Sequence, residues 1–126
     1  MPDLDGLDAD TRLLALAKAA STMADPVLLR ILGLLREDGE LTVGALTTAL
    51  PVSQPQVSIY LRCLSDCGYT RVRREGRRAH YRLAGPDVSD LLDRLNAHAT
   101  GSLQGLLACL HCNPATDSTG KRGACC

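Results

Sequence analysis

The sequence predicts a mainly α-helical domain with one small β-hairpin, and three observations carry this prediction. Apolar residues recur at helical spacing in separate segments up to residue 68, two alternating arginine-rich segments follow, and a last helical segment begins after Pro86. The chain has no Trp and no Phe, so its core must be built from aliphatic side chains. Because a small core of this kind often gains stability by pairing, we also expect a homodimer.

Two helices are expected before residue 40. The first begins near Asp10 or Thr11, either of which could cap it, and its apolar residues recur at helical spacing up to Met23. The second is expected over residues 26–38, in "PVLLRILGLLRED". An Asp-Pro pair at its start is favourable for a helix cap and first turn, and Gly39 is expected to end it.

Two short helices separated by a tight turn come next. The third helix is expected over residues 41–50, "LTVGALTTAL", with Thr42 as a cap, and the fourth follows a cap at Ser53 and ends at Gly68. This pair has the pattern of a helix-turn-helix. The buried face of the fourth helix is expected at Val57, Leu61 and Leu64.

The segments "YTRVRREG" and "RRAHYRLA" are expected to form the hairpin, with its turn at Glu75-Gly76, and a final helix is expected over residues 87–112. Helices, a helix-turn-helix and an arginine-rich hairpin in this order make a winged helix-turn-helix. In that architecture one helix enters the major groove of DNA and the hairpin lies along the backbone. Double-stranded operator DNA is therefore the expected partner.

One domain accounts for most of the chain. We expect a flexible N-terminus over residues 1–9, a DNA-binding and dimerisation domain over residues 10–112, and a flexible Cys-containing tail over residues 113–126. No segment approaches the roughly 20 apolar residues needed to cross a bilayer, and the acidic start lacks the pattern of a signal peptide. We therefore expect a cytoplasmic protein with no membrane partner.

Charge is unevenly distributed although the formal net charge is zero, because residues 70–82 carry six arginines and a single acid. Arginines on the hairpin would contact phosphates, whereas polar side chains at the start of the fourth helix would meet base edges. The alternative is that these arginines merely form a solvent-exposed face of the hairpin and bind no DNA. The expected DNA-contacting residues are Ser53, Gln54, Gln56, Ser58, Arg62, Arg73, Arg74, Arg77 and Arg78.

Six cysteines fall in pairs at positions 63/67, 109/112 and 125/126. In a reducing compartment such clusters indicate metal binding or redox chemistry. Cys63 and Cys67 are one helical turn apart on one flank of the fourth helix, which puts their Cβ atoms about 5 to 6 Å apart. Soft ions usually take three or four sulfurs, and Cys109 and Cys112 could supply the remainder. The alternative is two small buried cysteines that pack as apolar residues.

Three segments resemble the ArsR/SmtB family of metal-responsive bacterial repressors: "MADPVLLRILGLL", "LTVGALTTALPVSQPQVSIYLRCL" and "REGRRAHYRL". The resemblance covers residues 10 to about 112, with one departure at Tyr60, where many members have His. It implies a homodimer joined by the first and last helices. It also implies repression of genes for metal resistance or efflux, with release of DNA when metal binds. No nucleophile, base and orienting residue form a recognisable set, so we expect no enzyme.

The pattern "CLSDCG" is similar to that of the family's CmtR-type cadmium/lead sensors, in which a third cysteine comes from the C-terminal region of the other subunit. This resemblance implies Cys63 and Cys67 as ligands, Cys109 as the counterpart of the third ligand, and Cys112 as an extra candidate. Cd(II) or Pb(II) is the expected inducer. As(III) or Sb(III) is the alternative, since an all-sulfur pocket suits each of these ions.

The sequence matches the other kinds of sensor site less well. Residues 25–56 contain no Cys, so the cysteine cluster of the arsenic repressors has no counterpart there, and His98 lacks the partners of a zinc-type site on the last helix. A thiol redox switch at Cys67 is a further alternative, although a disulfide between residues one turn apart would strain a helix. Cys125 and Cys126 are expected to have at most an accessory role, because ordering a flexible tail costs entropy.

Overall fold

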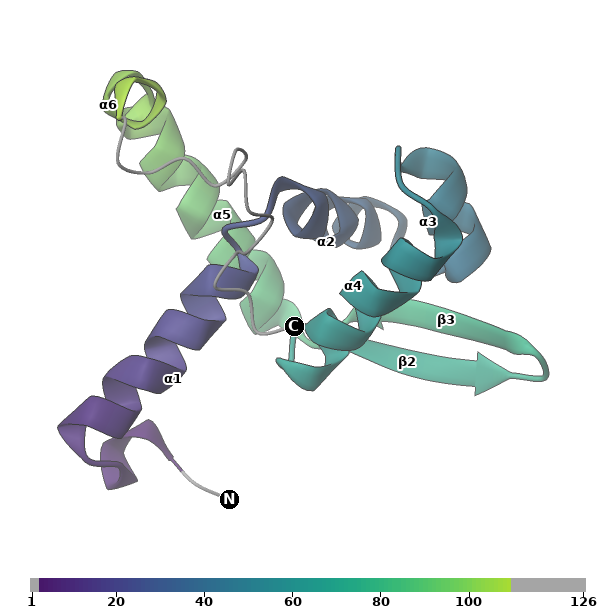
Figure 1. Cartoon of the computed structure of the whole chain (residues 1–126), viewed down its shortest axis with the longest axis horizontal. Coiled ribbons are helices and arrows are strands. Elements are labelled where there is room, and N and C mark those ends of the chain that lie inside the picture. The colour runs from purple at the N-terminus through teal and green to yellow at the C-terminus, as the bar shows by residue number, and fades with distance from the viewer. Residues whose placement is uncertain (1–2, 110–126) are drawn as a thin grey trace.

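The computed structural model describes residues 3–109. It confirms a mainly helical winged fold with a small sheet. In Figure 1, α3, α4 and the hairpin lie at one end, and α1, α5 and α6 lie at the other. The elements are η1 (Leu4–Gly6), α1 (Ala9–Thr22), α2 (Pro26–Asp38), β1 (Glu40–Thr42), α3 (Val43–Ala49), α4 (Gln54–Asp66), β2 (Thr70–Glu75), β3 (Arg78–Leu83), α5 (Pro86–Gly101) and α6 (Leu103–Ala108).

Helix α1 begins slightly earlier than expected. Its cap is Asp8, whose carboxylate accepts the backbone N–H of Thr11 at 3.1 Å. The prediction that Asp10 or Thr11 caps this helix is therefore wrong. Asp10 lies instead in the first turn, where a negative charge interacts favourably with the helix dipole.

Helix α2 has the boundaries that its sequence predicts. The carboxylate of Asp25 accepts the backbone N–H of Val27 at 2.8 Å, and Pro26 takes the first helical position. Gly39 ends the helix with φ at +82°, a conformation that glycine adopts at low cost.

The third segment holds a strand as well as a helix. Glu40–Thr42 forms β1, and α3 begins only at Val43, with Thr42 accepting the N–H of Ala45 as predicted for a cap. Strand β1 pairs antiparallel with β3, which gives the sheet order β1-β3-β2. A helix over all of residues 41–50 is therefore a wrong prediction, because a three-residue strand is too short to show an alternating pattern.

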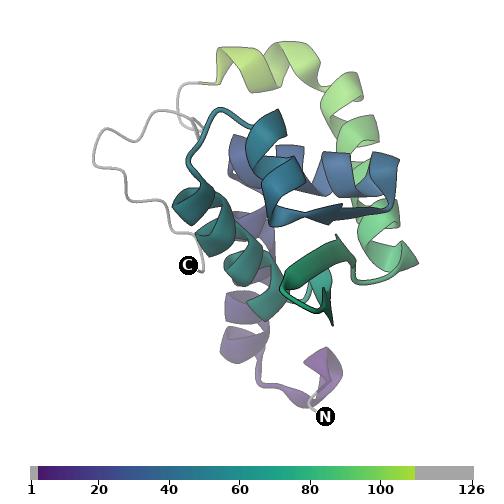
Figure 2. The same cartoon turned by 90° about the vertical axis from the view of Figure 1, so that its right-hand side faces the viewer.

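The helix-turn-helix and the hairpin form where they were expected. Ser53 caps α4 by accepting the N–H of Gln56 at 3.4 Å. Strands β2 and β3 pair over their whole length, from Thr70 opposite Leu83 to the hairpin turn. Figure 2 shows this turn and both helices of the motif on one side of the molecule.

The core is aliphatic apart from one tyrosine. Side chains from α2, α3 and α4 form a single cluster, to which Tyr69 and the first turn of α5 contribute. The hydroxyl of Tyr69 donates a hydrogen bond to the carbonyl oxygen of Ala19 at 2.7 Å, which ties α1 to this cluster. The cluster consists of Leu28, Ile31, Leu32, Leu35, Leu46, Leu50, Val57, Leu61, Leu64, Tyr69 and Val88.

The last helical segment is broken. Helix α5 ends at Gly101, Ser102 leaves the helical conformation at φ −122° and ψ 19°, and α6 covers Leu103–Ala108. Figures 1 and 2 show α6 running across the axis of α5. One continuous helix over residues 87–112 is thus a wrong prediction for its described part. Gly101 has a low helix propensity, which favours the break at this point.

Large apolar side chains remain exposed on the three helices at one end of the molecule. Some of them, Leu16, Leu91 and Leu95, line one groove between α1 and α5, and clustered exposed apolar surface marks sites of interaction. No helix within residues 3–109 is long and apolar enough to cross a membrane. The exposed side chains on these helices are Leu13, Leu14, Leu16, Leu91, Leu95, Leu103, Leu106 and Leu107.

Two substitutions on α4 test the division between its buried and exposed faces. Leu61→Ala should lower the free energy of unfolding by about 2 to 5 kcal/mol, because Leu61 is fully buried and its removal leaves a cavity. Ile59→Ala, at an exposed position on the same helix, should change it by less than about 0.5 kcal/mol. Urea denaturation at one fixed protein concentration measures both, and similar losses would contradict this orientation of α4.

Candidate nucleic-acid interface and thiol pair

Helix α4 has one buried and one exposed face. Val57, Leu61 and Leu64 are fully buried, which confirms the face expected from their spacing. The opposite face is exposed from the first turn onwards. The helix residues that the sequence predicts as DNA contacts, namely Gln54, Gln56, Ser58 and Arg62, are all exposed.

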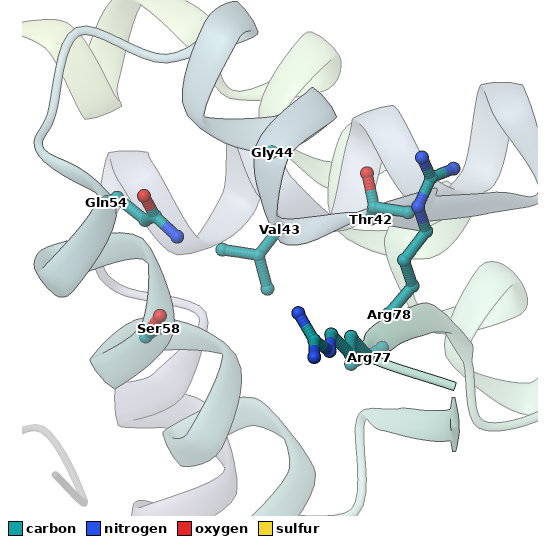
Figure 3. A pocket seen from close by; sticks show the side chains of 8 residues that line it. Thr42, Val43, Gly44, Gln54, Ser58, Arg77 and Arg78 are labelled. Atoms are coloured by element: carbon teal, nitrogen blue, oxygen red, sulfur yellow. The ribbon is translucent and has the colours of Figure 1, made fainter. Parts of the chain in front are cut away.

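A groove of about 550 Å³ separates the start of α4 from the hairpin turn (Figure 3). Gln54 and Ser58 lie on one side of this groove, and Arg77 extends its guanidinium towards them from the other. The guanidinium of Arg78 turns towards Thr42. Residues that the sequence assigns separately to the helix and to the hairpin therefore line one surface, where the guanidinium groups suit a phosphate. The lining residues are Thr42, Val43, Gly44, Gln54, Ser58, Arg77, Arg78 and Ala79.

Arg73 differs from the other predicted phosphate contacts because its charge is compensated within the sheet. Its guanidinium lies 2.6 Å from the Glu40 carboxylate in β1 and 2.8 Å from the Glu75 carboxylate in β2. In the part of the chain that the structure describes, no ion pair links Arg74, Arg77 or Arg78 to a carboxylate. Arg73 is therefore less available to a phosphate than the other three.

His80 completes this cluster on the polar face of the sheet. It lies opposite Arg73 on β2 and opposite Thr42 on β1. Its ring nitrogens are 3.6 Å and 3.8 Å from carboxylate oxygens of Glu40 and Glu75, respectively. The role of Glu40 is not evident from the sequence, because its pairing with Arg73 depends on a strand that only the fold reveals.

The cluster shifts the protonation of both carboxylates. Hydrogen bonds from the Arg73 guanidinium hold the pKa of Glu40 and that of Glu75 below their usual value. The two carboxylates in turn raise the pKa of Arg73. All three groups are thus charged at neutral pH, and the two carboxylates more than compensate the single positive charge of Arg73.

Cys63 and Cys67 lie one turn apart at the C-terminal end of α4. Cys63 is only 3% exposed, whereas Cys67 is half-buried. Cys67 is the C-cap residue, and its backbone N–H donates to the carbonyl oxygen of Cys63 at 3.0 Å. This bond keeps the two cysteines on one flank of the helix, at the end opposite to its exposed glutamines.

Cys109 belongs to a different part of the structure. It is half-buried and follows α6, which Figure 1 shows at the far end of α5, away from α4. Among residues 3–109, no three His, Cys, Asp or Glu side chains come together as a group that could hold a metal ion. The predicted ligand Cys112 lies outside the described residues, as do Cys125 and Cys126.

Residues 25–71 match the family model described as bacterial regulatory protein, arsR family. The matched segment runs from the cap of α2 to the start of β2 and so contains the whole helix-turn-helix.

Several curated relatives match most of the chain. The probable mercury resistance operon repressor of Streptomyces lividans is 34% identical over 93 residues, which are 74% of this chain and 74% of the relative. The HTH-type transcriptional regulator CmtR of Mycobacterium bovis is 36% identical over 89 residues, which are 71% of this chain and 75% of the relative.

A solved structure extends the likeness to the fold. It is the homodimeric winged helix-turn-helix DNA-binding domain of Mb0332 from Mycobacterium bovis, a possible ArsR-family transcriptional regulator. The two chains superpose with a TM-score of 0.67 at 35% identity, covering 75% of this chain and 87% of the other.

The Arg73→Gln variant tests the ion-pair cluster. It should raise the pKa of Glu40 and Glu75 towards the value of an exposed glutamate, because their hydrogen bonds to the guanidinium are lost. In the unaltered protein the folded pKa lies below the unfolded one, so the stabilisation is present at neutral pH and disappears as pH falls through the folded pKa. An NMR titration of the side-chain carboxyl carbons measures both values.

Arg74→Gln is the matched control, since it removes the adjacent positive charge from the other face of β2. It should leave the pKa values of Glu40 and Glu75 nearly unchanged. Equal shifts in the two variants would show that general charge, rather than the Arg73 hydrogen bonds, lowers these pKa values.

Proposed function

Because the chain belongs to the arsR family of bacterial regulatory proteins, we propose that it is a metal-responsive transcriptional repressor that binds operator DNA as a homodimer in the cytoplasm. Membership of a family of regulatory proteins agrees with the expectation that it is not an enzyme. One observation carries the proposal. Helix α4 has an exposed polar face beside an arginine-lined groove at one end and a pair of cysteines at the other.

In this proposal α4 enters the major groove of the operator. Gln54, Gln56, Ser58 and Arg62 then face base edges, and Ser53 contributes through the cap that orients the first turn. The hairpin arginines Arg74, Arg77 and Arg78 contact phosphates, which give affinity without reading sequence. Arg73 contributes least, because Glu40 and Glu75 already compensate its charge.

A second copy covers the apolar faces of α1 and α5. These helices border a groove of about 360 Å³ with a mainly apolar lining, which includes Leu16, Met23, Leu91 and Leu95. The homodimeric state of the Mb0332 domain supports this assembly. Two copies related by a two-fold axis present two α4 helices, which suits half-sites about one turn of DNA apart.

The inducer is a soft metal ion held by thiolates from both copies. Cys63 and Cys67 of one protomer provide two sulfurs, and Cys109, with Cys112, provides the rest from the partner. The separation of α6 from α4 within one chain supports ligands from two chains. We favour Cd(II) or Pb(II) on the spacing of "CLSDCG". As(III) and Sb(III) are the alternatives, and Hg(II) joins them because one relative is a probable mercury resistance repressor.

Metal binding would act on DNA through α4 itself. An ion that joins the C-terminal end of α4 to the partner's last segment restrains both reading helices relative to each other. If the metal-bound arrangement fits the half-sites less well, DNA affinity falls. A coupling of about 3 kcal/mol corresponds to a change of about 150-fold, and DNA must weaken metal binding by the same factor.

Replacing Arg77 with Gln should weaken binding to all DNA sequences and reduce its salt dependence. The slope of log K against log salt should lose about 0.9 for each phosphate contact removed, hence about 1.8 for a dimer. Arg73→Gln, a change of the same charge in the same hairpin, should alter the slope much less. Fluorescence anisotropy of labelled duplex DNA at several salt concentrations gives both slopes. An effect of Arg73→Gln equal to that of Arg77→Gln would exclude the proposed contact pattern.

Metal should no longer make the Cys63→Ser variant release DNA, since a hydroxyl is a poor ligand for soft ions. The affinity of this variant for DNA without metal should be retained. The measurement is a titration of the reduced DNA complex with Cd(II), Pb(II), Hg(II), arsenite and antimonite. Circular dichroism verifies folding, because Cys63 is buried. Unaltered release would refute this ligand assignment. Release by peroxide in metal-free buffer would favour the redox alternative.

A mixed dimer tests whether the ligands come from two chains. One protomer carries Cys63→Ser and Cys67→Ser, and the other carries Cys109→Ser and Cys112→Ser. If each site is shared between chains, the mixed dimer keeps one intact site and responds to metal, although both parental dimers fail. If each site lies within one chain, the mixed dimer also fails.

A further inference from the structure

Ile59 is directed outward from α4. Its side chain is 59% exposed, whereas Val57 and Leu61, two positions before and after it, are fully buried. It lies one helical turn from Pro55 and from Arg62, both of which are exposed. At about 100° per residue, Ile59 is about 200° from Val57 and thus nearly opposite the buried face.

Among the described residues, Ile59 belongs neither to the buried core nor to the apolar side chains packed against it. Along α4, all of which is described, it is the one exposed large aliphatic side chain. β-Branched residues are not favoured in helices, so helix propensity gives no reason for it either. The exposed leucines proposed to meet a second copy lie on α1 and α5, at the other end of the molecule (Figure 1).

We propose that Ile59 is a specificity-determining residue that packs against the C5-methyl group of a thymine in each operator half-site. This inference rests on the proposed function, in which α4 occupies the major groove. The methyl group of thymine is the apolar group that the major-groove edges of the base pairs present, while the other positions offer hydrogen-bond donors and acceptors. An isoleucine would desolvate those polar groups without replacing their hydrogen bonds.

The neighbouring groove fixes how α4 would approach the bases. Ser58, the residue before Ile59, lines this groove together with Arg77. A phosphate held by Arg77 would therefore set the position of the helix at the level of Ile59. Arg62, one turn further on, would contact an adjacent base or phosphate. The thymine should accordingly occupy one defined position within each half-site, flanked by positions read through hydrogen bonds.

The test uses an operator selected from a random DNA library by the reduced full-length protein. Each thymine is then replaced by deoxyuridine, symmetrically in both half-sites, which removes only the methyl group. At one position this replacement should weaken binding of the unaltered protein by about fourfold per half-site, as expected for the loss of one buried methyl. Ile59→Ala should weaken binding to the thymine operator and should no longer distinguish thymine from deoxyuridine at that position.

Leu4→Ala, which truncates an exposed side chain in the N-terminal turn, is the control and should keep the full thymine preference. If every replacement has the same effect on the unaltered protein and on Ile59→Ala, while both still bind the operator, the inference is overturned and the proposed function stands. If the protein selects no DNA at all, the proposed function fails, and this inference fails with it.

Discussion

The packing of one face of α4 into the aliphatic core is the constraint on which the rest of the structure depends. Val57, Leu61 and Leu64 join the leucines of α2 in one cluster, with no Phe or Trp to fill space between them. Because a helix turns by about 100° per residue, fixing these three positions also fixes which side chains point outward. The orientation of the exposed glutamines is thus determined by the leucines behind them.

The sheet holds the hairpin in a defined relation to that helix. Strand β1 leads directly into α3, and its pairing with β3 joins the hairpin to the helix-turn-helix through backbone hydrogen bonds. The ion pair between Glu40 and Arg73 crosses the same sheet. Since exposed ion pairs contribute little stability, the main effect of this one is on charge: it removes one arginine from the surface available to phosphate.

Local signals predicted most of the fold. Asp25-Pro26 and Ser53 act through neighbouring backbone groups, so their effect on helix ends can be read from the chain. Local signals failed where several residues could serve as the same helix cap, or where a strand's partner is distant in the sequence. Several aspartates stand near the start of α1, and β1 is defined only by its pairing with β3.

The candidate site was predictable to the same degree. Spacing alone puts Cys63 and Cys67 on one flank of α4, because both belong to one helix. Arg73 and Arg77 look equivalent in sequence, and only the fold brings Glu40, from 33 positions away, to one of them. In the proposed metal site, the relation of Cys109 to α4 depends on how two chains assemble, which one chain's residue pattern does not contain.

The interruption at Ser102 has a consequence for how such a protein diversifies. Because α6 runs on its own axis and its residues 103–108 are all exposed, side chains there can change with little effect on the packing of α5. Substitutions in α6 therefore need not destabilise the core of the domain. In this way one fold can evolve different ligand preferences in its last segment while α3 and α4, which would recognise DNA, stay unchanged.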